Sequence, residues 1–193
     1  MTDPLAHRRT AVHERTVEGF GTVRVLPLDP ATDAEVVHGW VTQERARFWG
    51  MLDADRARVQ EIYEYVDSLS THHAYLIHHE DRPAALFQTY QPEHDPVGEC
   101  YQVRPGDFGI HLMIGPVLGD PVPGWTGTLL SVFLGHVLAD PARLRLVAEP
   151  DARNDRAIAR LIRTGFTPGP EIQLPHKRAR LLFLDRADFT GAG

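Results

Sequence analysis

Short apolar segments, several of them alternating with polar residues, predict seven β-strands. Between them, apolar residues recur every three or four positions and predict four helices, one of which begins at Asp53 or Asp55. The strands are expected within residues 22–28, 73–79, 84–90, 107–116, 143–149, 171–174 and 178–185, and the other helices over 33–40, 125–139 and 154–164. This order predicts an α/β domain with a mixed sheet and helices on both faces.

The ends of the chain differ in how strongly they are patterned. Residues 1–19 have little apolar periodicity and predict an irregular N-terminal arm. Residues 20–187 contain no repeat and no long linker, so we expect a single domain there.

The segment 107–116 combines an apolar strand pattern with a histidine. Ile110 and Leu112 fall on one parity and His111 on the other, so a strand would turn the imidazole away from the isoleucine face. The segment ends at Gly115 and Pro116, and a loop rich in Gly and Pro leads into the next helix. A strand, a glycine loop and a helix start present backbone N–H groups to phosphate. A titratable imidazole beside such a loop predicts group transfer on a phosphorylated co-substrate.

Composition narrows the function classes. The chain has 193 residues, a net charge of −6 and a sequence pI near 6.0, which argue against a nucleic-acid surface. We expect no membrane span and no signal peptide, and the single cysteine, Cys100, fits a reducing cytoplasm. Eleven histidines raise the question of metal, but neighbours such as His72 and His73 point to opposite strand faces, so no metal site is expected.

The segment from Asn154 to Phe166 resembles the GNAT acyl-coenzyme A transferases. In that pattern an asparagine opens a helix, an alanine follows three residues later and a Gly-Phe pair ends it, as Asn154, Ala157 and the pair Gly165-Phe166 do here. The element order is similar to the same fold. The resemblance therefore implies a GNAT-like mixed and partly splayed central sheet.

Three further motifs resemble the siderophore-biosynthesis branch of that family. They are residues 48–51, the His111 strand with its Gly-Pro end, and residues 149–154. The branch includes aerobactin-type hydroxylysine acetyltransferases, mycobactin lysine acyltransferases and desferrioxamine-type acyltransferases of hydroxylated diamines. The resemblance implies that His111 and Asp151 are the catalytic pair, with Asp151 orienting His111 or attracting a cationic substrate.

The same resemblance implies the partners and the binding residues. Acetyl- or succinyl-coenzyme A is the expected co-substrate, with no permanently bound cofactor, and a small amine or hydroxylamine is the acceptor. Functional association with other siderophore-pathway enzymes is also expected. The residues expected to bind the co-substrate are Ile114, Gly124, Trp125, Thr126, Gly127, Thr128 and Asn154. Those expected to line the acceptor side are Phe48, Trp49, Met51, Gln88 and Tyr90.

Two parts of the chain depart from the family pattern. Pro121 and Pro123 stand in the phosphate loop and lack N–H donors, and Ile162 stands where many GNATs have a tyrosine acid. These departures leave two alternatives open. One is another GNAT N-acetyltransferase, acting on an aminoglycoside or a protein amine. The other is a coenzyme A-binding module without catalysis.

Overall fold

The computed structural model describes residues 9–116, 119 and 122–191. Its strands are β1 (His13–Val17), β2 (Gly21–Pro27), β3 (His72–His79), β4 (Arg82–Tyr90), β5 (Asp107–Ile114), β6 (Arg145–Ala148), β7 (Thr167–Gln173) and β8 (Arg178–Asp185). Its α-helices are α1 (Pro30–Val41), α2 (Arg56–Ser68), α3 (Trp125–Leu138) and α4 (Asp155–Arg163). Short 3₁₀ helices are η1 (Glu44–Trp49), η2 (Pro92–His94), η3 (Pro96–Glu99) and η4 (Arg186–Asp188).

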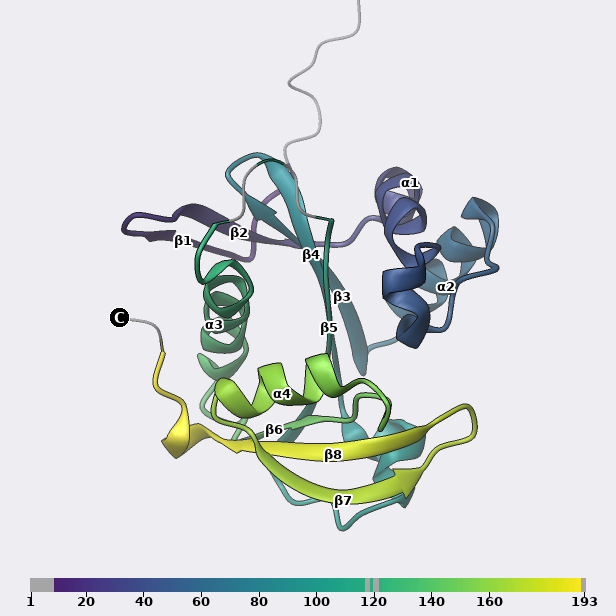
Figure 1. Ribbon diagram of the computed structural model, residues 1–193, viewed down its shortest axis with the longest axis vertical. Helices are drawn as coiled ribbons and strands as arrows, with labels where there is room; N and C mark the ends of the chain where they lie inside the picture. Colours follow the sequence, from purple (N-terminus) through teal and green to yellow (C-terminus); the bar gives the residue numbers. More distant parts are fainter. Residues whose placement is uncertain (1–8, 117–118, 120–121, 192–193) are drawn as a thin grey trace, which may run out of the picture.

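The strands form one mixed sheet in the order β1-β2-β3-β4-β5-β6-β8-β7. The β5–β6 pair is parallel, and the other pairs are antiparallel. Figure 1 shows α3 on one side of β3, β4 and β5, and α1 with α2 on the other. The predicted mixed sheet with helices on both faces is therefore confirmed.

The two faces of β5 separate as its sequence predicts. Ile110 packs in the core cluster that includes residues of α3, and Leu112 and Ile114 pack against that cluster. Met113 belongs instead to the cluster formed with α1 and α2. Strand alternation therefore places the His111 side chain, which shares the parity of Met113, on the α1–α2 face of the sheet.

The predicted irregular arm is wrong over residues 13–17, which form the edge strand β1. This strand pairs antiparallel with β2, and the Val12 N–H donates to the Val25 carbonyl at 2.9 Å. The side chains of β1 are only partly buried on one face and exposed on the other. Backbone hydrogen bonds to β2 therefore hold β1 in place, although its apolar pattern is too weak to identify it as a strand from the sequence.

Helix α1 begins earlier than residue 33, because the capping residue is Asp29 and not Asp33. The Asp29 carboxylate accepts the Ala31 N–H at 3.0 Å, and Pro30 occupies the first helical turn. Asp33 lies inside the helix and is buried, where it accepts hydrogen bonds from the Arg9 guanidinium and from the Asp29 N–H. A long-range ion pair thus removes Asp33 from the capping role.

Strands β5 and β6 stop pairing part-way along β5. Their register covers Asp107 to Gly109 on β5, whereas β5 pairs with β4 as far as Ile114. The Gly115 N–H donates to the Ala84 carbonyl at 2.8 Å, so antiparallel alternation turns the N–H groups of Leu112 and Ile114 away from β4. Figure 1 shows β5 extending beyond the short β6. The predicted partial splay is confirmed here.

No helix within the described ranges has both the length and the apolar character needed to cross a bilayer.

Candidate active site

His111 lies in the middle of β5, directly opposite Gln88 of β4, and its side chain is 32% exposed. The imidazole Nε2 is hydrogen-bonded to Oε1 of Glu149, the residue that follows β6. The other ring nitrogen, Nδ1, lies 3.1 Å from the side-chain amide oxygen of Gln88. The Glu149 side chain is only 3% exposed. The structure thus pairs an accessible imidazole with a buried carboxylate.

Tyr90 holds the second oxygen of that carboxylate. Its hydroxyl donates to Glu149 Oε2 at 2.6 Å, and its ring centroid lies 4.9 Å from that of His111. Gly109 is directly opposite Tyr90 on β5, and a Cβ at Gly109 would lie 2.1 Å from the Tyr90 ring. Glycine is therefore required for the ring to cross β5 and reach Glu149. Tyr90 itself is 1% exposed, so it supports Glu149 instead of lining the acceptor side.

Glu149 is ionised despite its burial. Burial alone would raise its pKa, but His111, Lys177 and the Tyr90 hydroxyl together lower the pKa from 4.5 to about 2. The Lys177 Nζ lies 3.6 Å from Glu149 Oε1. Burial and the negative charge of Glu149 raise the pKa of Tyr90 well above 10, so the phenol keeps its proton. At neutral pH the site contains a fixed carboxylate held by donors from separate elements.

Asp151 is not brought to His111. Its carboxylate pairs with Arg153, which donates from Nε at 2.9 Å and from Nη2 at 2.8 Å. Hydrogen bonding to Arg153 lowers the pKa of Asp151 to about 2. The predicted orienting contact between Asp151 and His111 is therefore replaced by Glu149, which sequence reasoning missed. A role for Asp151 toward a cationic substrate stays a prediction.

The available signal for Glu149 was its position. It follows the strand Leu146 to Ala148, whose residues are all buried, and a charge at the end of such a strand needs a partner. The carboxylate at Asp151 has a ready partner two residues away in Arg153, whereas the basic residues nearest to Glu149, Arg145 and Arg153, are each four residues away. That contrast pointed to Glu149 as the carboxylate paired across the sheet.

The predicted acceptor residues separate into two groups. Trp49 and Gln88 lie at His111, with the Trp49 ring centroid 6.4 Å from the imidazole in an edge-on arrangement. The Trp49 Nε1–H donates to the Tyr63 hydroxyl at 3.3 Å, which fixes the indole. The other two residues have different surroundings. Phe48 lies beneath the guanidinium groups of Arg47 and Arg153, and Met51 packs against the α1–α2 core.

The predicted phosphate loop leads into α3. Gly124 precedes the helix with φ of +76°, and no side chain of the described residues caps it. The Trp125 and Thr128 N–H groups donate to the carbonyls of Val122 and Gly124, which leaves those of Thr126 and Gly127 as the other donors of the first turn. Pro121 lies outside the described residues.

Two other predicted co-substrate residues have structural partners. The Ile114 carbonyl accepts a hydrogen bond from Arg45 Nη1 at 2.7 Å, while its N–H is turned away from β4. Asn154 caps α4 by accepting the Ala157 N–H at 3.2 Å. Binding of the co-substrate by residues 114, 124–128 and 154 stays a prediction.

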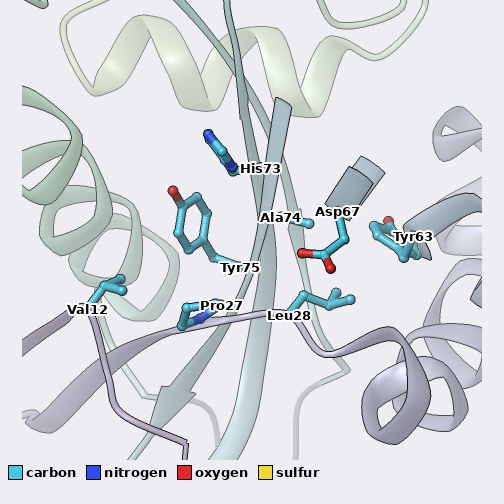
Figure 2. Close-up of a pocket in the computed structure, with 8 residues that line it drawn as sticks. All are labelled: Val12, Pro27, Leu28, Tyr63, Asp67, His73, Ala74 and Tyr75. Atoms are coloured by element: carbon cyan, nitrogen blue, oxygen red, sulfur yellow. The ribbon is translucent and has the colours of Figure 1, made fainter. Parts of the chain in front are cut away.

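A separate cavity of about 160 Å³ lies beside β3. Figure 2 shows His73 and Tyr75 on one side of the strand and Asp67 on the other. Its lining contains neither His111 nor Glu149. Among the described residues, no three His, Cys, Asp or Glu side chains are arranged to hold a metal ion.

Similarity to known proteins agrees with this geometry. The Acetyltransferase (GNAT) domain pattern matches residues 29–174, which is more than half of the chain. The chain belongs to the GNAT family. A solved structure of an uncharacterized protein from Bacillus halodurans shares this GNAT fold with a TM-score of 0.85, at 23% identity over 94% of this chain and 93% of that one.

Two curated relatives are named for acyl transfer involving a hydroxylated amino acid. This GNAT chain is 30% identical over 173 residues to the N(6)-hydroxylysine O-acetyltransferase of Escherichia coli, covering 83% of this chain and 51% of the relative. It is 29% identical over 168 residues to an N(5)-hydroxyornithine:cis-anhydromevalonyl coenzyme A-N(5)-transacylase of Beauveria bassiana, covering 82% and 35%. The chain therefore spans about half of the first relative and about a third of the second.

Proposed function

We propose that this protein is an acyl-coenzyme A N-acyltransferase of hydroxamate siderophore biosynthesis. The observation that carries the proposal is His111, held by the buried Glu149 on the strand where β5 and β6 stop pairing. The names of the two curated relatives support a hydroxylated amine as the acceptor. The acyl group is acetyl or succinyl, and the acceptor is a hydroxylated diamine or a lysine-like molecule. The protein would act in the cytoplasm beside the other enzymes of the pathway.

The reaction forms a C–N bond and breaks a C–S bond. The acceptor nitrogen attacks the thioester carbonyl carbon, and its proton passes to His111. The carbonyl oxygen becomes an oxyanion, which the N–H groups of Leu112 and Ile114 on the open side of β5 are oriented to stabilise. The oxyanion then re-forms the carbonyl as the C–S bond breaks, and the leaving thiolate takes a proton from the His111 imidazolium or from water. The acceptor nitrogen becomes the nitrogen of a hydroxamate.

Glu149 determines which imidazole nitrogen accepts the proton. Because the carboxylate is ionised, it keeps a proton on Nε2 and leaves the lone pair on Nδ1. The Gln88 amide oxygen, 3.1 Å from Nδ1, cannot donate to that lone pair. For His111 to act as the base, the Gln88 amide therefore turns its NH2 group toward Nδ1 or gives up this position to the acceptor nitrogen. General-base assistance of this kind contributes a factor of about 10²–10⁴.

A hydroxylated acceptor suits this site because the base does not have to deprotonate it before attack. An alkylamine with a pKa of about 10.4 is almost fully protonated at pH 7 and must first lose that proton. A hydroxylamine is far less basic and enters already neutral. His111 then only has to collect the proton released during attack.

The test is acyl transfer by the purified protein. Acetyl- or succinyl-coenzyme A is mixed with N-hydroxycadaverine, N(6)-hydroxylysine or lysine, and thiol release is followed together with the ferric-hydroxamate colour. We expect thiol release that depends on one hydroxylated acceptor, a coloured N-acyl product and loss of both in His111→Ala. An O-acyl ester without colour would overturn N-acylation, and coenzyme A binding without turnover on any acceptor would overturn the enzyme.

A further inference from the structure

Lys177 is the single lysine of the chain, whose other nineteen basic residues of the Lys/Arg type are arginines. It lies in the turn that joins β7 to β8, and its side chain is only 15% exposed. Its Nζ is 3.6 Å from Glu149 Oε1, the same oxygen that is hydrogen-bonded to His111. Lys177, from a distant part of the chain, and His111, the proposed base, therefore contact the same carboxylate oxygen of Glu149.

Backbone pairing fixes this lysine over the site. Ala179 forms a bridge with Asp151, and the Arg180 N–H donates to the Pro150 carbonyl at 3.0 Å. The Leu174 N–H donates to the Lys177 carbonyl at 2.9 Å and closes the turn. The start of β8 is thus held against the segment that follows Glu149, which directs the ammonium back to the carboxylate.

The charges around Glu149 come from several elements. The His111–Glu149 pair has three neutral neighbours, which are Tyr90 and Gln88 on β4 and Trp49 in η1. Farther out, Asp151 is paired with Arg153. On the other side of the Tyr90 ring, His72 lies beside Asp95. Among the residues that the structure describes, the fixed charges in contact with the His111–Glu149 pair are therefore the carboxylate of Glu149 itself and the ammonium of Lys177.

We propose that Lys177 is a positioning residue for acyl transfer: it is the permanent counter-charge of Glu149 and so keeps His111 neutral and able to accept a proton. This inference rests on the proposed function. A buried carboxylate requires a compensating charge. Without Lys177, the imidazolium form of His111 would be the cation available to Glu149, and an imidazolium has no lone pair with which to accept a proton.

The first test compares Lys177→Met with Lys177→Arg across a pH series. In K177M the acidic limb of kcat/KM for the hydroxylated acceptor is expected to move to higher pH by about one unit, which lowers activity about tenfold below the limb and restores it above. K177R retains the charge and is expected to keep the wild-type limb. An unmoved limb in K177M, or an equal loss at every pH, would overturn the proposal.

The second test does not depend on turnover. Ring-labelled histidine is titrated by NMR in the wild type and in K177M, with His111→Asn used to assign the His111 signal. We expect the His111 midpoint to rise in K177M without any acceptor present, and an unchanged midpoint overturns the proposal. If K177M does not fold, Lys177→Gln takes its place in both tests. A raised midpoint in a protein that acylates none of the hydroxylamines supports the charge role of Lys177 and overturns the proposed function instead.

Discussion

Replacing Glu149 with glutamine tests the central pair of the site. The change keeps the shape of the side chain but removes the negative charge that holds His111, Tyr90 and Lys177. The pKa of Glu149 is lowered from 4.5 to about 2. At about 1.4 kcal/mol per pH unit, that difference corresponds to at most about 3 kcal/mol of folding free energy, because the part that comes from the charge of His111 is present only when the imidazole is protonated.

Two effects are expected in Glu149→Gln. The protein should lose up to about 3 kcal/mol of stability at pH 7, measured by urea unfolding. The value of kcat/KM for the hydroxylated acceptor should fall by a factor of about 10²–10⁴, because no carboxylate fixes the proton on Nε2 of His111. The matched control is Asp151→Asn, which removes the carboxylate two residues away and leaves the His111 contacts in place.

Comparing these two variants shows whether Glu149 or Asp151 is the carboxylate that supports His111. We expect Asp151→Asn to keep kcat within a few-fold of wild type, since its carboxylate is bound to Arg153, whereas a role toward a cationic substrate would raise the KM of that substrate alone. Near-normal catalysis in Glu149→Gln together with loss of catalysis in Asp151→Asn would refute the assignment. It would restore Asp151 to the role that the family resemblance implied.

Three further outcomes are expected. Because the pKa of Glu149 is lowered on folding, its stabilisation is complete above pH 4.5 and is lost as the pH falls toward about 2, so the unfolding free energy should drop across that window in wild type and less in Glu149→Gln. Gly109→Ala places a methyl group against the Tyr90 ring and should cost about 1–3 kcal/mol in a thermal melt, while Gly39→Ala, where a Cβ meets open space, should not destabilise. Trp49→Ala should raise the KM of a cationic hydroxydiamine about fivefold, the loss of about 1 kcal/mol of cation–aromatic contact, and leave that of acyl-coenzyme A unchanged.

Periodicity predicted the elements that bury a continuous apolar face. The alternation in residues 107–114 correctly placed Ile110 and Met113 in different core clusters, because strand geometry turns successive side chains to opposite faces. Edge strand β1 was missed, since its side chains are exposed on one face and only partly buried on the other. The start of α1 was missed because Arg9, more than twenty residues away, binds Asp33 and leaves Asp29 as the cap.

The candidate site was predictable only in part. His111 was singled out as an imidazole in an apolar strand followed by a glycine loop, and the family resemblance implied its role. Tyr90 was assigned to the acceptor side, although a glycine in the middle of β5 indicated that a bulky group crosses the strand there. Lys177 could not be identified, because its contact with Glu149 depends on how the β7–β8 turn lies over the end of β6.

The contrast between Glu149 and Asp151 shows why the carboxylate that pairs with His111 was assigned wrongly from the sequence. Both side chains are buried, and both have a pKa lowered to about 2. Asp151 is neutralised locally by Arg153, a pair that is visible in the sequence and needs nothing else from the fold. The partners of Glu149 come from β4, β5 and the β7–β8 turn, so its charge remains stable only when the whole sheet is assembled. A carboxylate that already has its arginine two residues away has little need of a histidine across the sheet, and that local pairing was itself an argument for Glu149.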